Sequence, residues 1–222
     1  MTTGLTLTLR QQEQIMSETA SAVIGAGIVS FLPGISSLQA NKVKLALAMA
    51  ERATETAYQE GLIQDWFTYY RNQLKFMGWD SVSAEQIHWP DERRNKQSDQ
   101  VLETIAATAG EHFAAATSLA MQKLFSSPAA LGELERRAYE RQHFQLLPCA
   151  PAGANRVDMV LYHEVDIRAA FSAGFISHKR SHQIVRAELV RFNLLAFENS
   201  YLPKVQERVV QVSLRRILDY GV

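Results

Sequence analysis

The chain carries no charged residue between Glu18 and Lys42. Within this stretch, residues 20–32 are mostly apolar or small, and Pro33-Gly34 follows directly. A helix needs about 20 consecutive apolar residues to cross a bilayer, so this segment is too short to span one. We therefore expect a buried helix over residues 8–32 that ends before the proline. The small side chains and the missing charge leave insertion at a membrane interface open as an alternative.

The overall composition is that of an ordinary globular chain. Of the 222 residues, 47% are hydrophobic, and 23 basic residues balance 23 acidic ones. This apolar content is enough for one sizeable core, and the zero net charge argues against a nucleic-acid partner. The N-terminus lacks the basic region and apolar run of a secretory signal, so we expect a cytoplasmic protein with neither a signal peptide nor a transmembrane helix.

Helical patterning dominates as far as residue 141. Ser36 and Ser37 can cap a helix whose apolar positions Val43, Leu47 and Ala50 recur every three or four residues. The tripeptide 126–128, Ser-Ser-Pro, is typical of a helix start. The expected helices after the first cover residues 38–60, 62–77, 99–125 and 129–141.

The pattern changes to strand-like after this point. We expect strands at 143–149, 156–166 and 184–198, followed by a helix over 203–220. The prediction is a single α+β domain in which the mainly helical segment 1–142 packs on a small antiparallel sheet. That sheet is formed by the mixed segment 143–222.

The single cysteine, Cys149, is the sharpest candidate for chemistry. One cysteine excludes an internal disulfide framework and a cysteine-rich metal site. Cys149 follows an apolar run and lies between Pro148 and Pro151, which stiffen its backbone. It is either a small buried hydrophobic residue or a thiol that reacts or is acylated, and reaction requires a basic neighbour.

The candidate bases are His163, His178 and His182. His143, six residues upstream, would lie about 20 Å from Cys149 on an extended strand. His163 would also be distant in a tight hairpin, and His178 and His182 could reach the thiol only through tertiary folding. The latter two could share a helical face as metal ligands, but no third ligand is evident, so we expect no metal.

The carboxylates Glu164 and Asp166 alternate on an expected strand and therefore share one face. An acid–base pair is one interpretation, and a solvated sheet face that pairs with arginines is the other.

The order of elements and the position of Cys149 resemble the Erwinia virulence factor (Evf) group of bacterial proteins. Members of that group carry a long-chain fatty acid as a thioester on a cysteine, with the acyl chain in an apolar pocket. The resemblance implies that Cys149 is such an S-acylated residue. We expect the aromatic helix over 62–77 and the Ala-rich helix over 99–125 to line the pocket, because aromatic side chains can wall it and small side chains leave volume. It transfers no virulence role.

We therefore expect a fatty-acyl-binding protein, acting as an acyltransferase with Cys149 as nucleophile and His182, His178 or His163 as base. Its partner would be acyl-CoA or acyl carrier protein, with no cofactor besides the covalent acyl group. The alternative is a non-catalytic lipidated, toxin-like protein that associates peripherally with membranes. A third interpretation is a helical interaction protein with an inert buried cysteine.

Overall fold

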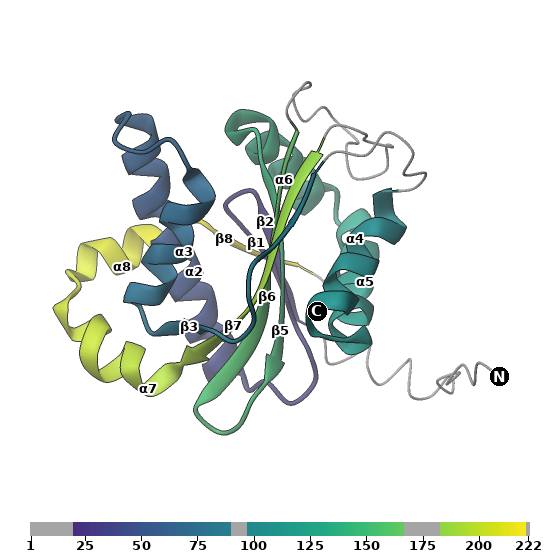
Figure 1. Ribbon diagram of the computed structural model, residues 1–222. Helices are drawn as coiled ribbons and strands as arrows, with labels where there is room; N and C mark the ends of the chain where they lie inside the picture. The colour runs from purple at the N-terminus through teal and green to yellow at the C-terminus, as the bar shows by residue number, and fades with distance from the viewer. Residues whose placement is uncertain (1–19, 90–96, 167–182, 221–222) are drawn as a thin grey trace.

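A computed structural model describes residues 20–89, 97–166 and 183–220. In these ranges, a mixed sheet is covered by helices on both faces (Figure 1). The strands are β1 (Ser21–Ile24), β2 (Gly27–Phe31), β3 (Trp79–Ser81), β4 (Gln86–His88), β5 (Phe144–Pro151), β6 (Arg156–Asp166), β7 (Gln183–Asn193) and β8 (Ile217–Tyr220). Their order is β3-β7-β6-β5-β2-β1-β8, with β4 also paired to β7. All described pairs are antiparallel except β2 with β5.

Two groups of helices cover the sheet (Figure 1). One face carries α2 (Ser37–Gln59), α3 (Trp66–Phe76), α7 (Leu194–Ala196) and α8 (Glu207–Leu214). The other face carries α4 (Gln97–Ala109), α5 (Glu111–Phe125) and α6 (Pro128–Arg141). A π-helical turn (Phe197–Tyr201) and a 3₁₀ turn (Leu202–Lys204) follow α7.

The alternation of side chains along β5 supplies both cores. Leu147 and Cys149 belong to the apolar cluster under α2 and α3, whereas Phe144 and Leu146 belong to the cluster under α4, α5 and α6. Successive strand residues point to opposite faces, so a strand buried on both sides is apolar throughout. The two clusters are therefore separated by the sheet itself.

Several local predictions are confirmed. Ser36 caps α2 in a capping box. The backbone amide of Gln39 donates to Ser36 Oγ (3.2 Å), and the backbone amide of Ser36 donates to Gln39 Oε1 (2.8 Å). Pro128 occupies the first position of α6, directly after Ser127. Strand β6 has the expected bounds, and the mixed α+β class is confirmed.

The helix expected up to residue 32 is wrong in its described part. Residues 21–31 form the hairpin β1–β2, with Gly25 at φ +57° in the turn. Every residue of both strands is buried, because α2 lies over one face and α5 and α6 over the other. The absence of charge thus reflects a hairpin whose strands are buried on both faces. A buried helix would lack charge in the same way, so the pattern did not distinguish the two. The remainder of that expectation lies outside the described residues.

Three further expectations need correction. The helix expected over 99–125 is divided at Gly110, whose φ of +104° no helix residue adopts. The strand expected to reach residue 198 ends at Asn193, whose side chain accepts from the Ala196 amide (3.1 Å) and caps α7. In the helix expected over 203–220, only α8 is regular α-helix and residues 217–220 pair with β1 as β8.

The sheet is accordingly larger than expected and is mixed. It takes β1 to β4 from the segment before residue 143, and the parallel β2–β5 pair lies near its centre. In the three described ranges, no helix has both the length and the apolar character needed to cross a bilayer.

Candidate functional site

Cys149 lies near the carboxyl end of β5, with its side chain in the apolar layer under α2 and α3. Its exposed fraction is 0%, and its cross-strand partners are Phe31 on β2 and Met159 on β6. The thiol donates to the Leu147 carbonyl oxygen at 3.5 Å. The thiol therefore lies in an apolar environment whose one recorded polar contact is a backbone carbonyl of its own strand.

Burial raises the pKa of the Cys149 thiol well above its ordinary value. Tyr70 on α3 belongs to the same apolar cluster, and burial, the Glu51 carboxylate and the Cys149 thiol together raise the pKa of Tyr70. A thiolate would be shielded from solvent here, and no cation in the described part of the chain is recorded as stabilising it. In this conformation Cys149 is a protonated thiol and a poor nucleophile.

The structure separates Cys149 from the candidate base that it describes. His163 on β6 pairs with Gln145, four residues along β5 from Cys149. At the rise of an antiparallel strand, this is about 13 Å, too far for direct proton transfer. His178 and His182 lie outside the described residues.

His163 instead lies beside His143 at the amino end of β5, a pairing that the sequence did not predict. The two ring centroids are 5.1 Å apart. Trp66, in the first turn of α3, lies at centroid distances of 4.1 Å from His143 and 5.5 Å from His163. Phe67 contacts His163 at 5.1 Å. The beginning of α3 thus covers both imidazoles.

Both imidazoles are held neutral by their surroundings. Burial, followed by the nearby Arg141, lowers the pKa of His143 to about 3. Burial, His143 and Arg186 lower the pKa of His163 well below its ordinary value. Nε2 of His143 and Nδ1 of His163 have no hydrogen-bond partner among the described residues. Within the described ranges, neither ring has a carboxylate as a hydrogen-bond partner that could compensate a positive charge.

A buried carboxylate, Glu51, lies on α2 on the same side of the sheet. Its exposed fraction is 1%, and Oε1 lies 3.2 Å from the Arg141 guanidinium. Burial, only partly offset by Arg141, raises the pKa of Glu51 to about 7. One helical turn further along α2, Glu55 pairs with Arg141 (3.0 Å) and with Arg216. Burial acts against ionisation of Glu55, but these two arginines lower its pKa overall.

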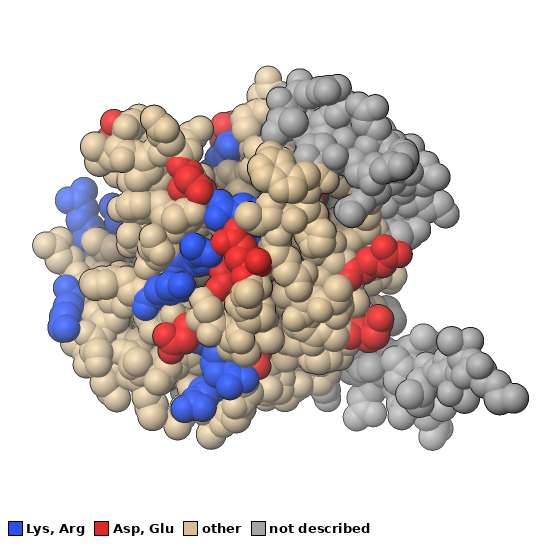
Figure 2. Space-filling view, viewed as in Figure 1, with Lys and Arg blue, Asp and Glu red and all other residues tan. Residues whose placement is uncertain are grey.

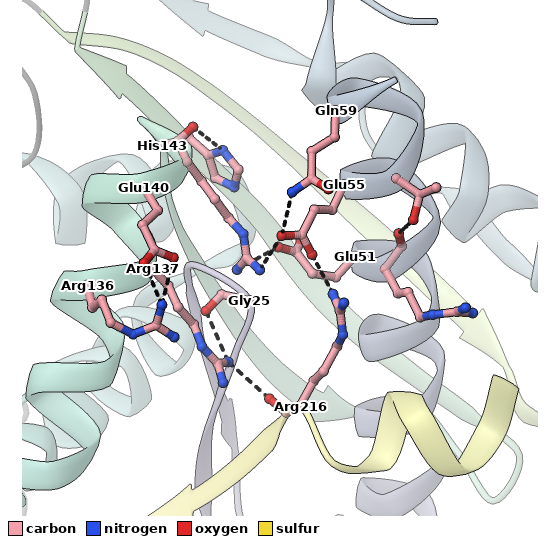
Figure 3. Close-up of polar contacts among 12 residues, drawn as sticks. Gly25, Glu51, Glu55, Gln59, Arg136, Arg137, Glu140, His143 and Arg216 are labelled. Carbon is pink, nitrogen blue, oxygen red and sulfur yellow. Dashed lines mark hydrogen bonds and ion pairs between the residues drawn. The ribbon is translucent and has the colours of Figure 1, made fainter. Parts of the chain in front are cut away.

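Figure 3 shows how this polar group is assembled. Glu51 and Glu55 point from α2 into the space between the helices, and Arg216 reaches Glu55 from the turn directly before β8. Arg137 donates from α6 to the backbone carbonyls of Gly25 (3.5 Å) and Arg216 (3.0 Å). These contacts join α2, α6, the β1–β2 turn and the turn directly before β8.

The other candidate carboxylates do not form a site with Cys149. Glu164 is buried and accepts from the Tyr162 hydroxyl at 2.9 Å, and Tyr162 belongs to the opposite cluster, under α4, α5 and α6. Nothing is described of the Asp166 side chain. Among the described residues, no group of three or more histidine, cysteine or acidic side chains could hold a metal ion.

A cleft of about 460 Å³ opens at the other end of this layer. It lies between the start of α2 and the β5–β6 turn, and Pro151 and Leu194 are among its lining residues. Pro151 is two residues from Cys149 on the same strand, so both side chains point to the same face. The volume lies within the range of small-molecule sites, about 300–1,000 Å³.

No protein-family model and no curated protein matches the chain. A solved structure of the Evf virulence factor is similar over 90% of this chain and 82% of that chain, with 15% sequence identity and a TM-score of 0.36. This is distant fold-level similarity and does not place the chain in a family.

Proposed function

We propose that Cys149 carries a long-chain fatty acyl group as a stable thioester, stored between the sheet and helices α2 and α3. The observation that supports this proposal is the complete burial of the one thiol in an apolar layer. Transfer of an acyl chain from water into an apolar layer is favourable by about 0.8 kcal/mol of free energy per CH₂ group. A long-chain acyl group is therefore strongly stabilised when it is buried in such a layer.

The layer around Cys149 has the side chains that such a chain requires. The face of α2 toward the sheet includes the small residues Ala46 and Ala50, and α3 contributes Phe67 and Tyr70. The expectation that the Ala-rich segment 99–125 lines the pocket needs correction, because α5 packs on the opposite face of the sheet. An acyl chain on Cys149 would extend past Pro151 toward the cleft at the start of α2.

Formation of the thioester needs only an acyl-CoA or an acyl carrier protein as donor. The Cys149 sulfur attacks the acyl carbonyl carbon, the new S–C bond forms, and the donor C–S bond breaks. The proton of the Cys149 thiol passes to the departing thiolate of the donor. Because Cys149 is buried, the helical layer over it must open for this exchange.

The site geometry favours a stable adduct over repeated acyl transfer. A transferase needs a thiol that ionises and a base within about 3 Å of it, whereas the Cys149 pKa is raised and His163 is four residues away along the strands. The same burial that disfavours the thiolate would protect a thioester from water.

Intact-mass spectrometry tests the proposal on protein purified without reductant or hydroxylamine, before and after incubation with palmitoyl-CoA. We expect the added mass of one acyl group, its removal by hydroxylamine, and no addition to Cys149→Ala. An unmodified wild-type protein under both conditions would contradict the proposal and leave an inert buried cysteine. Continuous release of fatty acid or acyl product from palmitoyl-CoA would instead identify an acyltransferase.

Association with membranes is tested separately by flotation with phosphatidylcholine–phosphatidylglycerol vesicles. If the acyl group supports binding, acylated wild type floats and Cys149→Ala does not. Identical partitioning of the two proteins would contradict a membrane role for the acyl group.

A further inference from the structure

One helix, α3, packs over the imidazole pair and contributes to the apolar layer that buries the thiol. In its first turn, Trp66 lies over His143 and His163, at 4.1 Å and 5.5 Å. One turn later, Tyr70 stacks on Trp66 at 4.8 Å and belongs with Cys149 to the apolar cluster on this face of the sheet. Any movement that lifts the start of α3 from the sheet therefore uncovers the imidazoles and loosens the cover of the thiol together.

We infer that α3 is an acid-opened lid: protonation of His143 and His163 lifts it from the sheet and exposes Cys149. The role of this lid in admitting an acyl group rests on the function proposed above. The movement of α3 itself does not depend on that function.

The surroundings of the two rings supply the driving force. Each ring has an unpartnered nitrogen, buried and facing protein rather than water. Two imidazolium rings with centroids 5.1 Å apart would repel each other, and a buried charge without a partner is costly. Exposure to water relieves both penalties, so a bound proton favours the open state.

The charged groups around the pair are mostly basic. Arg141 acts on His143, and Arg186 on β7 acts on His163. From α2, Glu55 favours protonation of His143, but this carboxylate is engaged by Arg141 and Arg216. No other charged group among the described residues acts on either ring strongly enough to shift its pKa.

Glu51, also on α2, responds to pH in the opposite sense. Its raised pKa means that it takes up a proton in the closed state, which would stabilise that state in acid. Its neighbours include Arg141 and the β1–β2 turn, which do not move with α3, and Tyr70, which does. Lifting α3 removes the Tyr70 side of this environment, so Glu51 offsets part of the effect of the two imidazoles.

Ion pairs hold α3 closed at neutral pH. Asp65, the N-cap of α3, pairs with Arg186 (2.9 Å), and Arg71 pairs with Glu85 in the β3–β4 connection. Figure 2 shows acidic and basic side chains meeting near the centre of this face of the molecule. Although burial opposes it, the hydrogen bonds and charges of their partners lower the pKa of both carboxyls, so these pairs persist at pH 5. These ion pairs oppose opening of the lid, so the pH at which the lid opens lies below the imidazole pKa of about 6.5.

The expected size of the effect follows from proton linkage. An imidazole exposed in the open state has a pKa of about 6.5. If the same ring stays neutral in the closed state, lowering the pH from 7.5 to 5.0 raises the equilibrium constant for lid opening about thirtyfold. Two such rings acting together raise it several hundredfold, on the order of the product of their separate effects.

Thiol labelling measures the opening. Protein treated with hydroxylamine, so that Cys149 is a free thiol, is reacted with 4,4′-dithiodipyridine from pH 7.5 to pH 5.0. Each rate is divided by the rate in guanidinium chloride at the same pH. We expect the normalised rate of wild type to rise at least tenfold toward pH 5.0, with unchanged far-UV circular dichroism. A flat normalised rate, or a rise that accompanies loss of helix signal, would overturn the inference.

Substitutions then assign the effect. His143→Gln and His163→Gln should each lose a large part of the rise. The control His112→Gln changes an exposed histidine on α5, on the opposite face, and should keep the wild-type profile. If the normalised labelling rate rose fully in both His143→Gln and His163→Gln, or failed to rise in His112→Gln, the assignment to the imidazole pair would be overturned.

Hydrogen exchange on wild type provides a test that does not depend on these variants folding. After correction for intrinsic rates, exchange in Trp66–Phe76 should be faster at pH 5.0 than at pH 7.5, and exchange in Glu111–Phe125 should not change. Equal acceleration of both helices would show general acid unfolding and contradict a lid. Acylation of Cys149 is not measured in any of these experiments, so failure of the lid and failure of the proposed function are distinguishable.

Discussion

Gly25 lies directly against the side chain of Glu51. A Cβ atom placed on Gly25 would be 2.2 Å from both Cδ and Oε1 of Glu51, closer than any unstrained contact. The turn of the β1–β2 hairpin and the middle of α2 are therefore fitted to each other without room for a methyl group.

Gly25→Ala should destabilise the protein by about 2–4 kcal/mol, because it adds a buried clash to a strained φ of +57°. Urea unfolding measures the loss. Gly132→Ala is the matched control, since its Cβ would meet nothing within 4 Å and it lies in α6. That change should be neutral or stabilising by up to about 1 kcal/mol, and equal losses in both variants would contradict the contact.

Arg141 and Arg136 on the same helix should differ sharply in their importance. Arg141 pairs with the buried Glu51 and with Glu55, and Glu55 keeps Arg216 as a partner, so Arg141→Ala leaves the buried Glu51 carboxylate without its ion pair and should cost about 3 kcal/mol. Arg136 makes shorter contacts with Glu133 (2.8 Å), but its side chain is 53% exposed. Arg136→Ala should therefore cost less than about 1 kcal/mol in the same unfolding experiment. Similar losses would show that the Glu51 pair is not effectively buried.

Glu51→Gln should change the pH dependence of stability. The folded-state pKa of about 7 exceeds the ordinary 4.5, so the ionised carboxylate costs stability above pH 4.5, and this cost grows up to about pH 7. Relative to wild type, the variant should gain about 2 kcal/mol of unfolding free energy between pH 5 and pH 8. Urea titrations at four pH values measure this difference.

Glu140→Gln serves as the control for that titration. Glu140 is exposed on α6 and pairs with Arg136, so its difference from wild type should stay within about 0.5 kcal/mol over the same range. If the Glu51→Gln difference were equally flat, the burial of the Glu51 carboxylate would be refuted.

Cys149→Ser should be less stable than Cys149→Ala. The alanine leaves a small void, whereas the serine hydroxyl enters an apolar layer where the Leu147 carbonyl lies 3.5 Å from the longer cysteine side chain. We expect a difference of about 1–2 kcal/mol in favour of alanine. Neither variant can form a thioester, so the comparison is independent of acylation. Equal stability would indicate that water or a polar partner reaches this position.

The sequence predicted the elements that have strong local end signals. The Ser36 cap and the Ser127-Pro128 start identified α2 and α6 to within one residue or two, because these residues satisfy or replace free amide donors. Strand β6 was recognisable because β-branched and aromatic residues are interspersed with polar ones.

The β1–β2 hairpin could not be recognised in the same way. A strand buried on both faces has no polar–apolar alternation, so residues 20–32 satisfied a helix pattern equally well. Gly25 was the available signal, since its positive φ ends one strand and starts the next.

Cys149 could be identified as a candidate because it is the one cysteine in the sequence. The residues that surround it depend on the pairing register of the strands, which the sequence does not show. His143 and His163 meet because Gln145 pairs with His163, and no local pattern specifies that pairing. Glu51 had a weak local signal: it follows Leu47 by four residues, which places a carboxylate on the apolar face of α2.

The parallel pairing of β2 with β5 has a consequence for how the chain reaches its folded state. The two strands are separated in sequence by everything from α2 to α6, so the centre of the sheet cannot form until that long crossover is in place. Such contacts slow folding because the loop must close before they stabilise anything. Until then the uncharged hairpin has an open edge, so we expect refolding yields that fall with protein concentration.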